Sequence, residues 1–394
     1  MIGAPPQAYA VLKDPALRAV LGVLPEARLV GGAVRDTLAG LAVHDIDLAT
    51  PRTPQAIMTA LREAGLKAVP TGIAHGTVTA VVDHRGFEIT TLRRDIATDG
   101  RHAVVAFTDD WREDAARRDF TINAMSMAAD GQVFDYFNGV EDLRVGRLRF
   151  VGDPGSRIAE DYLRILRFFR FWARFATQPP DAATHAALQA GIPGLARLSV
   201  ERVWNELSRL LATPDPMPAI MLMDELGVLG AIIPEGAVPA RLAGLVAAGA
   251  PADPLLRLAA LLTDNAASLV ARLRLSSAER KKLIALSELP SPMPDLDDNA
   301  LRRMLADTPA DILIGRTWLA GINEPVWDQL RARLATFPVP RFALEGRDAV
   351  ALGVPPGTRV GDLLRQVRLW WLAGGCTAPP DRCRAELRRL IASQ

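Results

Sequence analysis

The hydrophobic positions of the first 150 residues alternate between helix-like and strand-like spacing. Residues 11–24 and 51–66 carry apolar side chains three and four positions apart, which predicts amphipathic helices. Each begins with a capping residue followed by proline, Asp14 in the first and Thr53 in the second. Residues 71–95 instead alternate apolar and polar side chains around a break at DHRG, which predicts a β-hairpin. This order predicts a mixed sheet flanked by helices.

Four further segments follow the predicted hairpin. Residues 96–115 are polar, charged and interrupted by glycine, which predicts a mobile loop. Helical spacing returns over 116–127, and 131–154 is expected to form a small hairpin in which VFDYF and LRF flank an NGVEDL turn. Residues 156–176 carry apolar side chains around nearly the whole circumference of a helix, which predicts a buried helix.

From about residue 181 the chain is rich in alanine and leucine, with helical spacing punctuated by proline and glycine. No internal repeat or low-complexity tract stands out. The predicted fold class is therefore α+β, with a mixed sheet and helices in the N-terminal part and an all-helical C-terminal half.

Composition narrows the class of protein. A chain of 394 residues is longer than the usual length of a domain with a single hydrophobic core, which suggests two to four domains. Hydrophobic residues make up 49% and charged residues 23%, as in soluble globular proteins, and no apolar run is as long as a membrane span. The first residues lack the basic and apolar regions of a signal peptide. Cys376 and Cys383 form neither a disulfide framework nor a zinc set, so we expect a reducing cytoplasm.

Net charge does not by itself indicate a nucleic-acid partner. The formal charge is +1, and only four of the 46 basic residues are lysines. Arginine's planar guanidinium suits phosphates and base edges, but a GC-rich genome also favours arginine codons. The charge balance is therefore neutral on function.

The densest candidate chemistry lies in residues 29–50, LVGGAVRDTLAGLAVHDIDLAT. The string predicts a strand, a tight glycine turn, a short helix and a second strand. Gly31 and Gly32 allow the backbone to bend sharply and approach a ligand closely. Arg35 follows one turn into the helix, where unpaired N–H groups favour an anion.

Two acidic residues end this stretch. Asp45 and Asp47 are two positions apart on the presumed strand, so both carboxylates project from the same face. Two hard oxygen ligands beside a phosphate-binding turn are what Mg²⁺-dependent phosphoryl transfer needs. Glu88, on the strand predicted at 87–93, is either a third carboxylate of this site or a surface residue of an open sheet. His75 is expected to be structural or to contact substrate, because no other metal-ligand spacing accompanies it.

The predicted buried helix at 156–176 also carries charged residues at three-residue steps: Asp161, Arg164, Arg167 and Arg170. Burying unpaired charge is costly, so these groups need partners. Pairing of Arg164 with Glu160 or Asp161 is one solution. The other is a nucleotide base, because Asp161 can accept from the exocyclic amino group of cytosine or adenine while Arg164 donates to the ring nitrogen. Guanine and uracil present the opposite pattern and would be rejected.

Three strings stand in the order and near the spacing of a known family. They are GG-x-x-R followed by DxD at 31–47, RRDFTINAM at 117–125 and EDxxRxxR at 160–167. Together they resemble the active-site signature of the nucleotidyltransferase superfamily, in particular the bacterial class II tRNA CCA-adding enzymes and their poly(A) polymerase relatives. The string at 198–216 is similar to a fifth family motif, a helix that supports the nucleotide pocket. The resemblance covers roughly residues 28–235.

The resemblance implies a polymerase-beta-like head that adds C, C and A to tRNA from CTP and ATP with two Mg²⁺ ions. It implies Asp45, Asp47 and Glu88 as catalytic residues and Asp45 and Asp47 as the metal ligands. The implied nucleotide-binding residues are Gly32, Arg35, Arg118, Asp119, Asn123, Asp161, Arg164, Arg167 and Arg170. The loop near 96–112 would help the pocket change from C to A, because a pocket for the smaller pyrimidine cannot accept a purine unchanged.

The resemblance also implies a domain order: a catalytic head at 1–150, a base-recognition neck at 151–212, a helical body at 213–300 and a helical tail at 301–394. The tail contains arginines together with Trp370 and Trp371. These residues would bind tRNA through its phosphates and by stacking, or they would form an ordinary apolar core with a solvated charged face. Some relatives carry an HD phosphohydrolase site within 253–265. Here no histidine follows His185, so that chemistry is expected to be absent.

Several alternatives remain open. A bacterial poly(A) polymerase uses the same chemistry, although LVGGAVRD differs from the basic string those polymerases tend to carry. An enzyme of the same family that adds only CC or only A is a further alternative. A catalytically inactive RNA-binding protein would not need Asp45 and Asp47. Transfer of a nucleotidyl group to a small molecule would not need EDxxRxxR.

Overall fold

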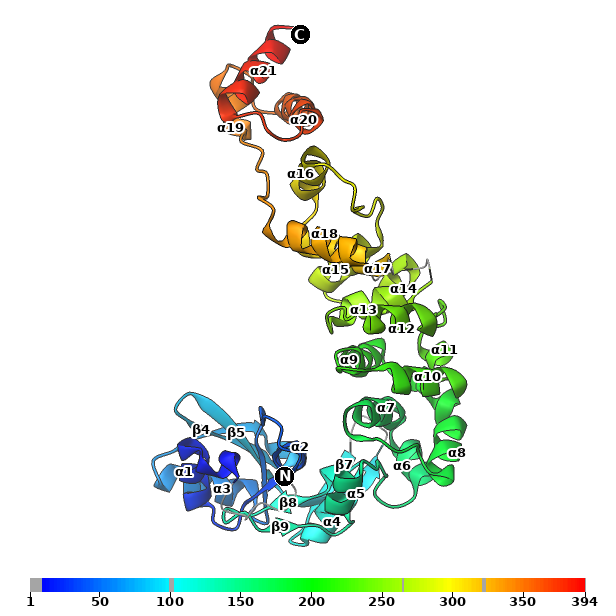
Figure 1. Cartoon of the computed structure of the whole chain (residues 1–394). Coiled ribbons are helices and arrows are strands. Elements are labelled where there is room, and N and C mark those ends of the chain that lie inside the picture. The colour runs from blue at the N-terminus through cyan, green and yellow to red at the C-terminus, as the bar shows by residue number, and fades with distance from the viewer. Residues whose placement is uncertain (1–8, 99–102, 264–265, 321–323, 394) are drawn as a thin grey trace. The chain divides into compact units, whose positions relative to one another are not determined.

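The computed structural model describes residues 9–98, 103–263, 266–320 and 324–393, and between 95 and 105 it describes the backbone alone. The chain divides into two compact units, Met1–Pro234 and Glu235–Gln394 (Figure 1). The first unit contains the sheet and the second is helical, so the predicted α+β class is confirmed.

A seven-stranded mixed sheet organises the first unit, with strand order β3-β4-β5-β2-β1-β8-β9. Its strands are β1 Arg28–Val30, β2 Asp47–Thr50, β3 Lys67–Gly72, β4 Thr77–Val82, β5 Arg85–Thr91, β8 Ser126–Met127 and β9 Val133–Phe134. β2 is parallel to β5, and the other neighbouring pairs are antiparallel. The strand that carries the DxD string is therefore central, as predicted, and β4 and β5 form the predicted hairpin.

Helices α1 Pro15–Val23, α2 Gly32–Leu38 and α3 Pro54–Glu63 share one apolar core with the sheet. Both predicted caps are present: Asp14 accepts from the backbone N–H groups of Ala16 and Leu17, and Thr53 accepts from Ala56. Leu48 of β2 belongs to this core, and its neighbour Ala49 packs with Val30 and Leu92 in a separate cluster. Because side chains alternate along a strand, Asp47 faces away from α1 and α3.

The loop predicted over 96–115 is wrong. β6 Arg93–Thr98 and β7 Ala103–Phe107 form a separate two-stranded sheet, and α4 Trp111–Ala116 follows. Residues 99–102 lie outside the described residues. The run AVVAF contains β-branched valines, which favour extended backbone once a neighbouring strand is available to pair with it. Asp110 caps α4 by accepting from the N–H of Arg112.

The helix predicted over 116–127 is also wrong. Ala116 ends α4, Phe120 forms an isolated bridge with Phe150, and one 3₁₀ turn, η4 Thr121–Asn123, precedes β8. The Asp119 carboxylate accepts from the N–H of Phe120 and from the side chain of Asn123. Such local side-chain hydrogen bonds compete with the hydrogen bonds of a helix.

The hairpin predicted over 131–154 is wrong as well. β9 pairs with β8, and the NGVEDL string forms helix α5 Gly139–Val145 instead of a turn. Asp135 explains the difference, since its carboxylate accepts from the N–H groups of Gly139 and Val140 at the start of α5. Phe150 makes only an isolated bridge with Phe120.

Residues 156–176 form two helices rather than the single helix predicted. α6 Pro154–Glu160 ends at Asp161, which has extended backbone angles, and α7 Leu163–Phe175 begins after it. Asp161 accepts from the N–H of Leu163 and so helps to start α7. Burial around nearly the whole circumference was predicted, but α7 buries one face, which includes Phe168, Phe169 and Phe171, and leaves Arg174 exposed. The first unit continues with α8 Ala182–Gly191, η5 Ile192–Arg197, α9 Val200–Leu211, α10 Met217–Glu225 and α11 Val228–Ile232.

The second unit consists of helices around several small apolar cores. They are α12 Pro239–Ala247, α13 Pro254–Leu261, α14 Ala266–Arg272, α15 Ser277–Ser287, α16 Asp298–Asp307, α17 Ala310–Leu319, α18 Pro325–Thr336, α19 Gly346–Ala351, α20 Thr358–Ala373 and α21 Pro380–Ala392. Trp371 is buried in the last core, whereas Trp370 is exposed. Among the described residues no helix has the length and apolar character needed to cross a bilayer.

Candidate active site

One cavity of about 1550 Å³ lies in the first unit, between α2, the start of β2, the 117–123 segment, α7 and α9. It gathers most of the residues singled out from the sequence. The predicted residues that line it are Gly32, Arg35, Asp45, Asp47, Arg118, Asp119, Asn123, Asp161, Arg164, Arg167 and Arg170. Glu88 does not line it, and neither does His75, whose backbone oxygen accepts from the Arg93 side chain.

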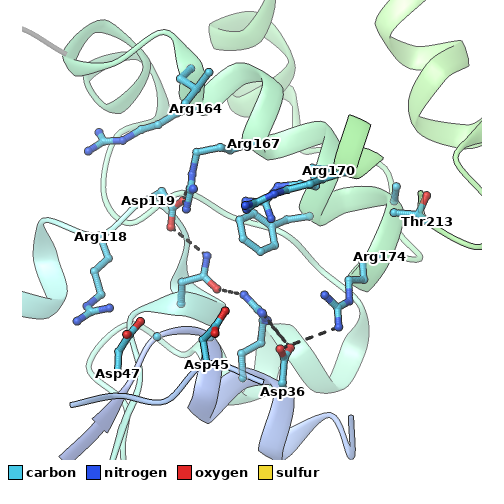
Figure 2. Close-up of a pocket in the computed structure, with 18 of the residues that line it drawn as sticks. Asp36, Asp45, Asp47, Arg118, Asp119, Arg164, Arg167, Arg170, Arg174 and Thr213 are labelled. Atoms are coloured by element: carbon cyan, nitrogen blue, oxygen red, sulfur yellow. Dashed lines mark hydrogen bonds and ion pairs between the residues drawn. The ribbon is translucent and has the colours of Figure 1, made fainter. Parts of the chain in front are cut away.

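The two aspartates lie at one side of this cavity (Figure 2). Asp47 is the first residue of β2, whereas Asp45 precedes the strand, so the expectation that both lie on it is wrong. Their alternate positions still bring both carboxylates to the cavity. Glu88 on β5 stands in register with Asp47 on the neighbouring strand.

The electrostatics of Asp47 indicate a site that favours a cation. Desolvation by the surrounding protein raises the pKa of Asp47, and the nearby carboxylates of Glu88 and Asp45 raise it further, while Arg118 acts in the opposite direction. Crowded carboxylates are what a divalent cation relieves. Within the described residues no cluster of three or more His, Cys, Asp or Glu residues is placed to hold a metal. Asp45 and Asp47 are hard oxygen ligands of the kind that a divalent cation prefers, and both line the cavity.

A chain of hydrogen bonds connects the DxD side of the cavity with α7 (Figure 2). Arg35 donates to Asn123 Oδ1 at 2.6 Å, and Asn123 donates to Asp119 Oδ1 at 3.0 Å. Arg167 of α7 donates through Nε to Asp119 Oδ2 at 2.7 Å. The first three of these side chains are buried, so the chain holds α2, η4 and α7 in a defined arrangement.

Asp119 is ionised at the centre of that chain. Burial by itself would raise the pKa of Asp119, but the charge of Arg167 and the hydrogen bonds from Asn123, Arg167 and the N–H of Phe120 outweigh it. The pKa of Asp119 is consequently held below its ordinary value. Asp119 is thus a fixed acceptor that orients its neighbours.

Arg118 is positioned by a residue that the sequence reading did not single out. Asp114, which is buried in α4, pairs with Arg117 at 2.8 Å and with Arg118 at 3.2 Å, and it accepts from the backbone N–H of Arg93 at 3.2 Å. The usable signal was helical spacing, since Asp114 precedes the two arginines by three and four positions. Gly31 makes room for Arg118: a Cβ there would lie 2.9 Å from its Nη1, and φ at Gly31 is +63°.

Asp161 and Arg164 both line the cavity but do not pair with each other. Arg202 donates to Asp161 Oδ2 at 2.7 Å, and Arg164 pairs with Glu160 and donates to the backbone oxygen of Arg157. The internal pairing of Arg164 with Glu160 considered from the sequence is therefore present. Asp161 and Arg164 thus line the same cavity, each with a partner of its own.

Glu206 of α9 is a second site residue that sequence reasoning missed. Its buried carboxylate lies 2.6 Å from Arg170 and 3.9 Å from Arg167. The sequence did contain a signal for this role, because Glu206 is an acidic residue on the apolar face that Val203, Leu207 and Leu210 form. Glu206 therefore compensates the charge of two arginines of α7 at the wall of the cavity.

The chain matches two family descriptions, the poly A polymerase head domain over residues 27–149 and the probable RNA and SrmB-binding site of polymerase A over residues 180–238. The mitochondrial CCA tRNA nucleotidyltransferase 1 of Mus musculus is 36% identical over 389 residues, which span 92% of this chain and 87% of that relative. The chain belongs to the CCA tRNA nucleotidyltransferase family. The similarity to this family member extends well beyond the 28–235 region expected from the motifs.

Two further comparisons, one over part of the chain and one over nearly all of it, give the same family. The CCA-adding enzyme of Leuconostoc mesenteroides is 44% identical over 189 residues, 47% of this chain and 46% of that enzyme. The crystal structure of the Bacillus stearothermophilus CCA-adding enzyme in complex with CTP superimposes with a TM-score of 0.73 at 26% identity. That superposition covers 96% of this chain and 98% of the other.

Proposed function

We propose that this protein rebuilds the 3′-terminal CCA of tRNA from CTP and ATP, without a nucleic-acid template and with release of pyrophosphate. The observation that carries the proposal is the single cavity that contains both the Asp45–Asp47 pair and the acid and arginine side chains of Asp161 and Arg164. The first pair suits phosphoryl transfer, and the second suits recognition of a base. The family relationship supports the same reaction.

The metal in this proposal is Mg²⁺, held by Asp45 and Asp47. When bound, Mg²⁺ would promote deprotonation of the primer 3′-hydroxyl and neutralise charge on the triphosphate and the leaving pyrophosphate. Arg118 carries positive charge toward the same side of the cavity and would orient the triphosphate, with Asp114 holding its guanidinium. Gly32 and Arg35 line the cavity as well and would contact the nucleotide.

Base selection rests on the pattern of donors and acceptors. Asp161 accepts from the exocyclic amino group of cytosine or adenine, and Arg164 donates to the adjacent ring nitrogen. Guanine or uracil would set a carbonyl oxygen against the carboxylate and a ring N–H against the guanidinium, and both contacts are repulsive. To contact the base, Asp161 uses a carboxylate lone pair that Arg202 does not engage, or it releases Arg202. Arg164 likewise uses an N–H group that Glu160 does not engage, or it releases Glu160. Arg167 and Arg170, anchored by Asp119 and Glu206, support the wall behind them.

The domain roles follow from the same proposal. Residues 1–150 act as the catalytic head, 151–212 as the neck, 213–300 as the body and 301–394 as a tail that contacts tRNA. We place the protein in the cytoplasm, where reduced thiols such as the buried, free Cys376 and Cys383 are stable. The β6–β7 pair would help the pocket change from C to A. Asp264, in the segment where some relatives carry a hydrolase site, lies outside the described residues.

The test uses tRNA transcripts that end before CCA, after C and after CC, each with CTP, ATP or both. We expect ordered addition of C, C and A that stops after A. Open-ended A tails would instead assign a poly(A) polymerase, and addition of only C or only A would assign the narrower enzyme. Binding of tRNA without any incorporation would leave a non-catalytic RNA-binding protein.

A further inference from the structure

The cavity is larger than one nucleotide requires. Pockets for a single small-molecule ligand occupy roughly 300 to 1,000 Å³, whereas this cavity measures about 1550 Å³. If the protein transfers nucleotides to an RNA primer as proposed, the end of that primer must occupy the same space as the incoming nucleotide. The charged groups of the cavity indicate where the end of the primer lies.

Most arginines of the cavity already have short-range carboxylate partners. Arg117 and Arg118 pair with Asp114, Arg167 with Asp119, Arg170 with Glu206, Arg164 with Glu160 and Arg202 with Asp161. Such pairs hold their guanidinium groups in place, and their charge is largely compensated within the protein.

Arg174 and Arg209 differ from the rest. Arg174 is 44% exposed, and its ion pair with Asp36 is long, at 4.0 Å from Nη2 to Oδ2. Asp36 is itself engaged at 2.8 Å by Arg35. Arg209 is exposed, and within the described part of the chain no ion pair involves it. Arg174 and Arg209 are therefore arginines of the cavity whose charge is weakly compensated.

These two arginines belong to one end of the cavity. Arg174 lies in the last turn of α7 and Arg209 in the last turn of α9, two helices that pack against each other. The wall continues beyond α9 through Ala212 to Asp215. Figure 2 shows Arg174 and Thr213 on the side opposite Arg118 and Asp47, with Asp45 and Asp36 between them. This end is thus separate from the end at which Arg118 lies, and Asp36 and Asp45 stand between it and Asp47 (Figure 2).

We propose that Arg174 and Arg209 bind phosphodiester groups of the last nucleotides of the RNA primer. The inference rests on the proposed function, because that reaction places the primer 3′-hydroxyl beside Asp45 and Asp47. A guanidinium suits a phosphodiester, which offers two anionic oxygens to its planar donors. The weak pairing with Asp36 lets Arg174 turn to a phosphate with little loss.

The experiment compares the full-length protein with Arg174→Gln, Arg209→Gln and the double variant on a transcript that ends before CCA. We expect the KM for tRNA to rise about tenfold for each substitution, the loss of one charged hydrogen-bonding contact. The KM for CTP and kcat at saturating tRNA should stay within about twofold of wild type. The dependence of log Kd for tRNA on log salt should fall by roughly one for each arginine removed.

The controls separate charge from fold. Arg62→Gln changes an exposed arginine of α3 outside the cavity and should leave the KM for tRNA unchanged. Arg174→Lys keeps the charge and should recover the wild-type salt dependence.

Two results would overturn the inference: weaker CTP binding in the absence of tRNA, which would assign these arginines to the triphosphate, or unchanged tRNA affinity. A wild-type protein that adds no nucleotides would instead refute the proposed function, which the incorporation assay detects separately.

Discussion

At the scale of single residues, carboxylates in this molecule do two different jobs. Asp45 and Asp47 stand exposed at the cavity with neighbours of like charge, whereas Asp114, Asp119 and Glu206 are buried against arginines. In the proposed function the first kind binds a cation, whereas the second kind fixes the direction of a guanidinium. Substituting members of each kind should therefore change different measurable quantities.

Replacing Asp47 by asparagine should lower kcat for nucleotide incorporation by about 10³-fold or more, since a metal contributes several kcal/mol to phosphoryl transfer. Glu88→Gln is the matched comparison on the neighbouring strand. Glu88 does not line the cavity and acts on Asp47 through its charge, so we expect a loss of less than about tenfold. Single-turnover incorporation assays measure both. Equal losses for the two variants would show that Glu88 takes part directly.

Asp114→Asn should weaken nucleotide binding. The neutral side chain keeps the shape but no longer compensates Arg117 and Arg118, so Arg118 loses its fixed orientation. We expect the KM for CTP to rise about tenfold, the effect of roughly 1.4 kcal/mol. Asp110→Asn is the control on the same helix, because asparagine caps as well as aspartate. Parallel changes in both variants would indicate a general effect on α4.

Asp119 makes acid stability a test of the buried network. Its pKa is lower in the folded protein than in the unfolded chain, so the unfolded chain binds more protons between the two values. The stabilisation is complete above the unfolded pKa and is lost as the pH falls from about 4 through the folded value. Urea unfolding at a series of pH values should show a steeper acid loss in wild type than in Asp119→Asn. Identical slopes would mean that Asp119 is not paired as described.

At the scale of elements, short segments take their conformation from the groups that cap or contact them. Asp135 accepts hydrogen bonds at the start of α5, where the sequence predicted a turn. Asp161 separates α6 from α7, where the sequence predicted one helix. α5 in turn packs closely on η4, where Asn123 and its hydrogen bonds lie. The positions of the site residues thus depend on how closely these small elements approach.

Gly139→Ala should disturb this contact. A Cβ at Gly139 would lie 2.2 Å from the backbone oxygen of Thr121 in η4, so one element must move. We expect a loss of about 1 to 3 kcal/mol in unfolding free energy and a lower kcat/KM for incorporation. Gly22→Ala is the matched control, because that glycine lies in α1 with nothing within 4 Å of the added atom. It should stabilise the protein by about 0.4 to 1 kcal/mol. Thermal or urea unfolding measures both, and equal effects would contradict the close packing of α5 on η4.

At the scale of the whole molecule, every residue that lines the cavity belongs to the first of the two compact units. The cavity draws its walls from segments between Gly31 and Asp215, which the fold brings together from separate elements. The second unit has its own small cores, including the one that buries Trp371 and leaves Trp370 exposed. The similarity to the mouse enzyme covers 92% of this chain, so it extends into both units.

Local sequence patterns determined the elements whose signals lie within a few residues. The caps at Asp14 and Thr53, the β4–β5 hairpin and the central position of β2 followed from periodicity and capping chemistry, because those interactions are local. Most of the site residues predicted from the motifs also line the cavity, whereas Glu88 does not. The segments predicted incorrectly lie between 96 and 176, where distant partners override weak local preferences.

Only the tertiary structure decided how the charged residues are partnered. The sequence offered Glu160 or Asp161 as the partner of Arg164, and the fold selects Glu160 and pairs Asp161 with Arg202. It brought Asp114 and Glu206 to the site, and it left Arg174 and Arg209 with weakly compensated charge. Ion pairs form between groups that packing brings within a few ångströms, and packing depends on contacts between residues far apart in the chain. The sequence by itself therefore determined which chemical groups this protein has available, and the fold determined which of them are free to act.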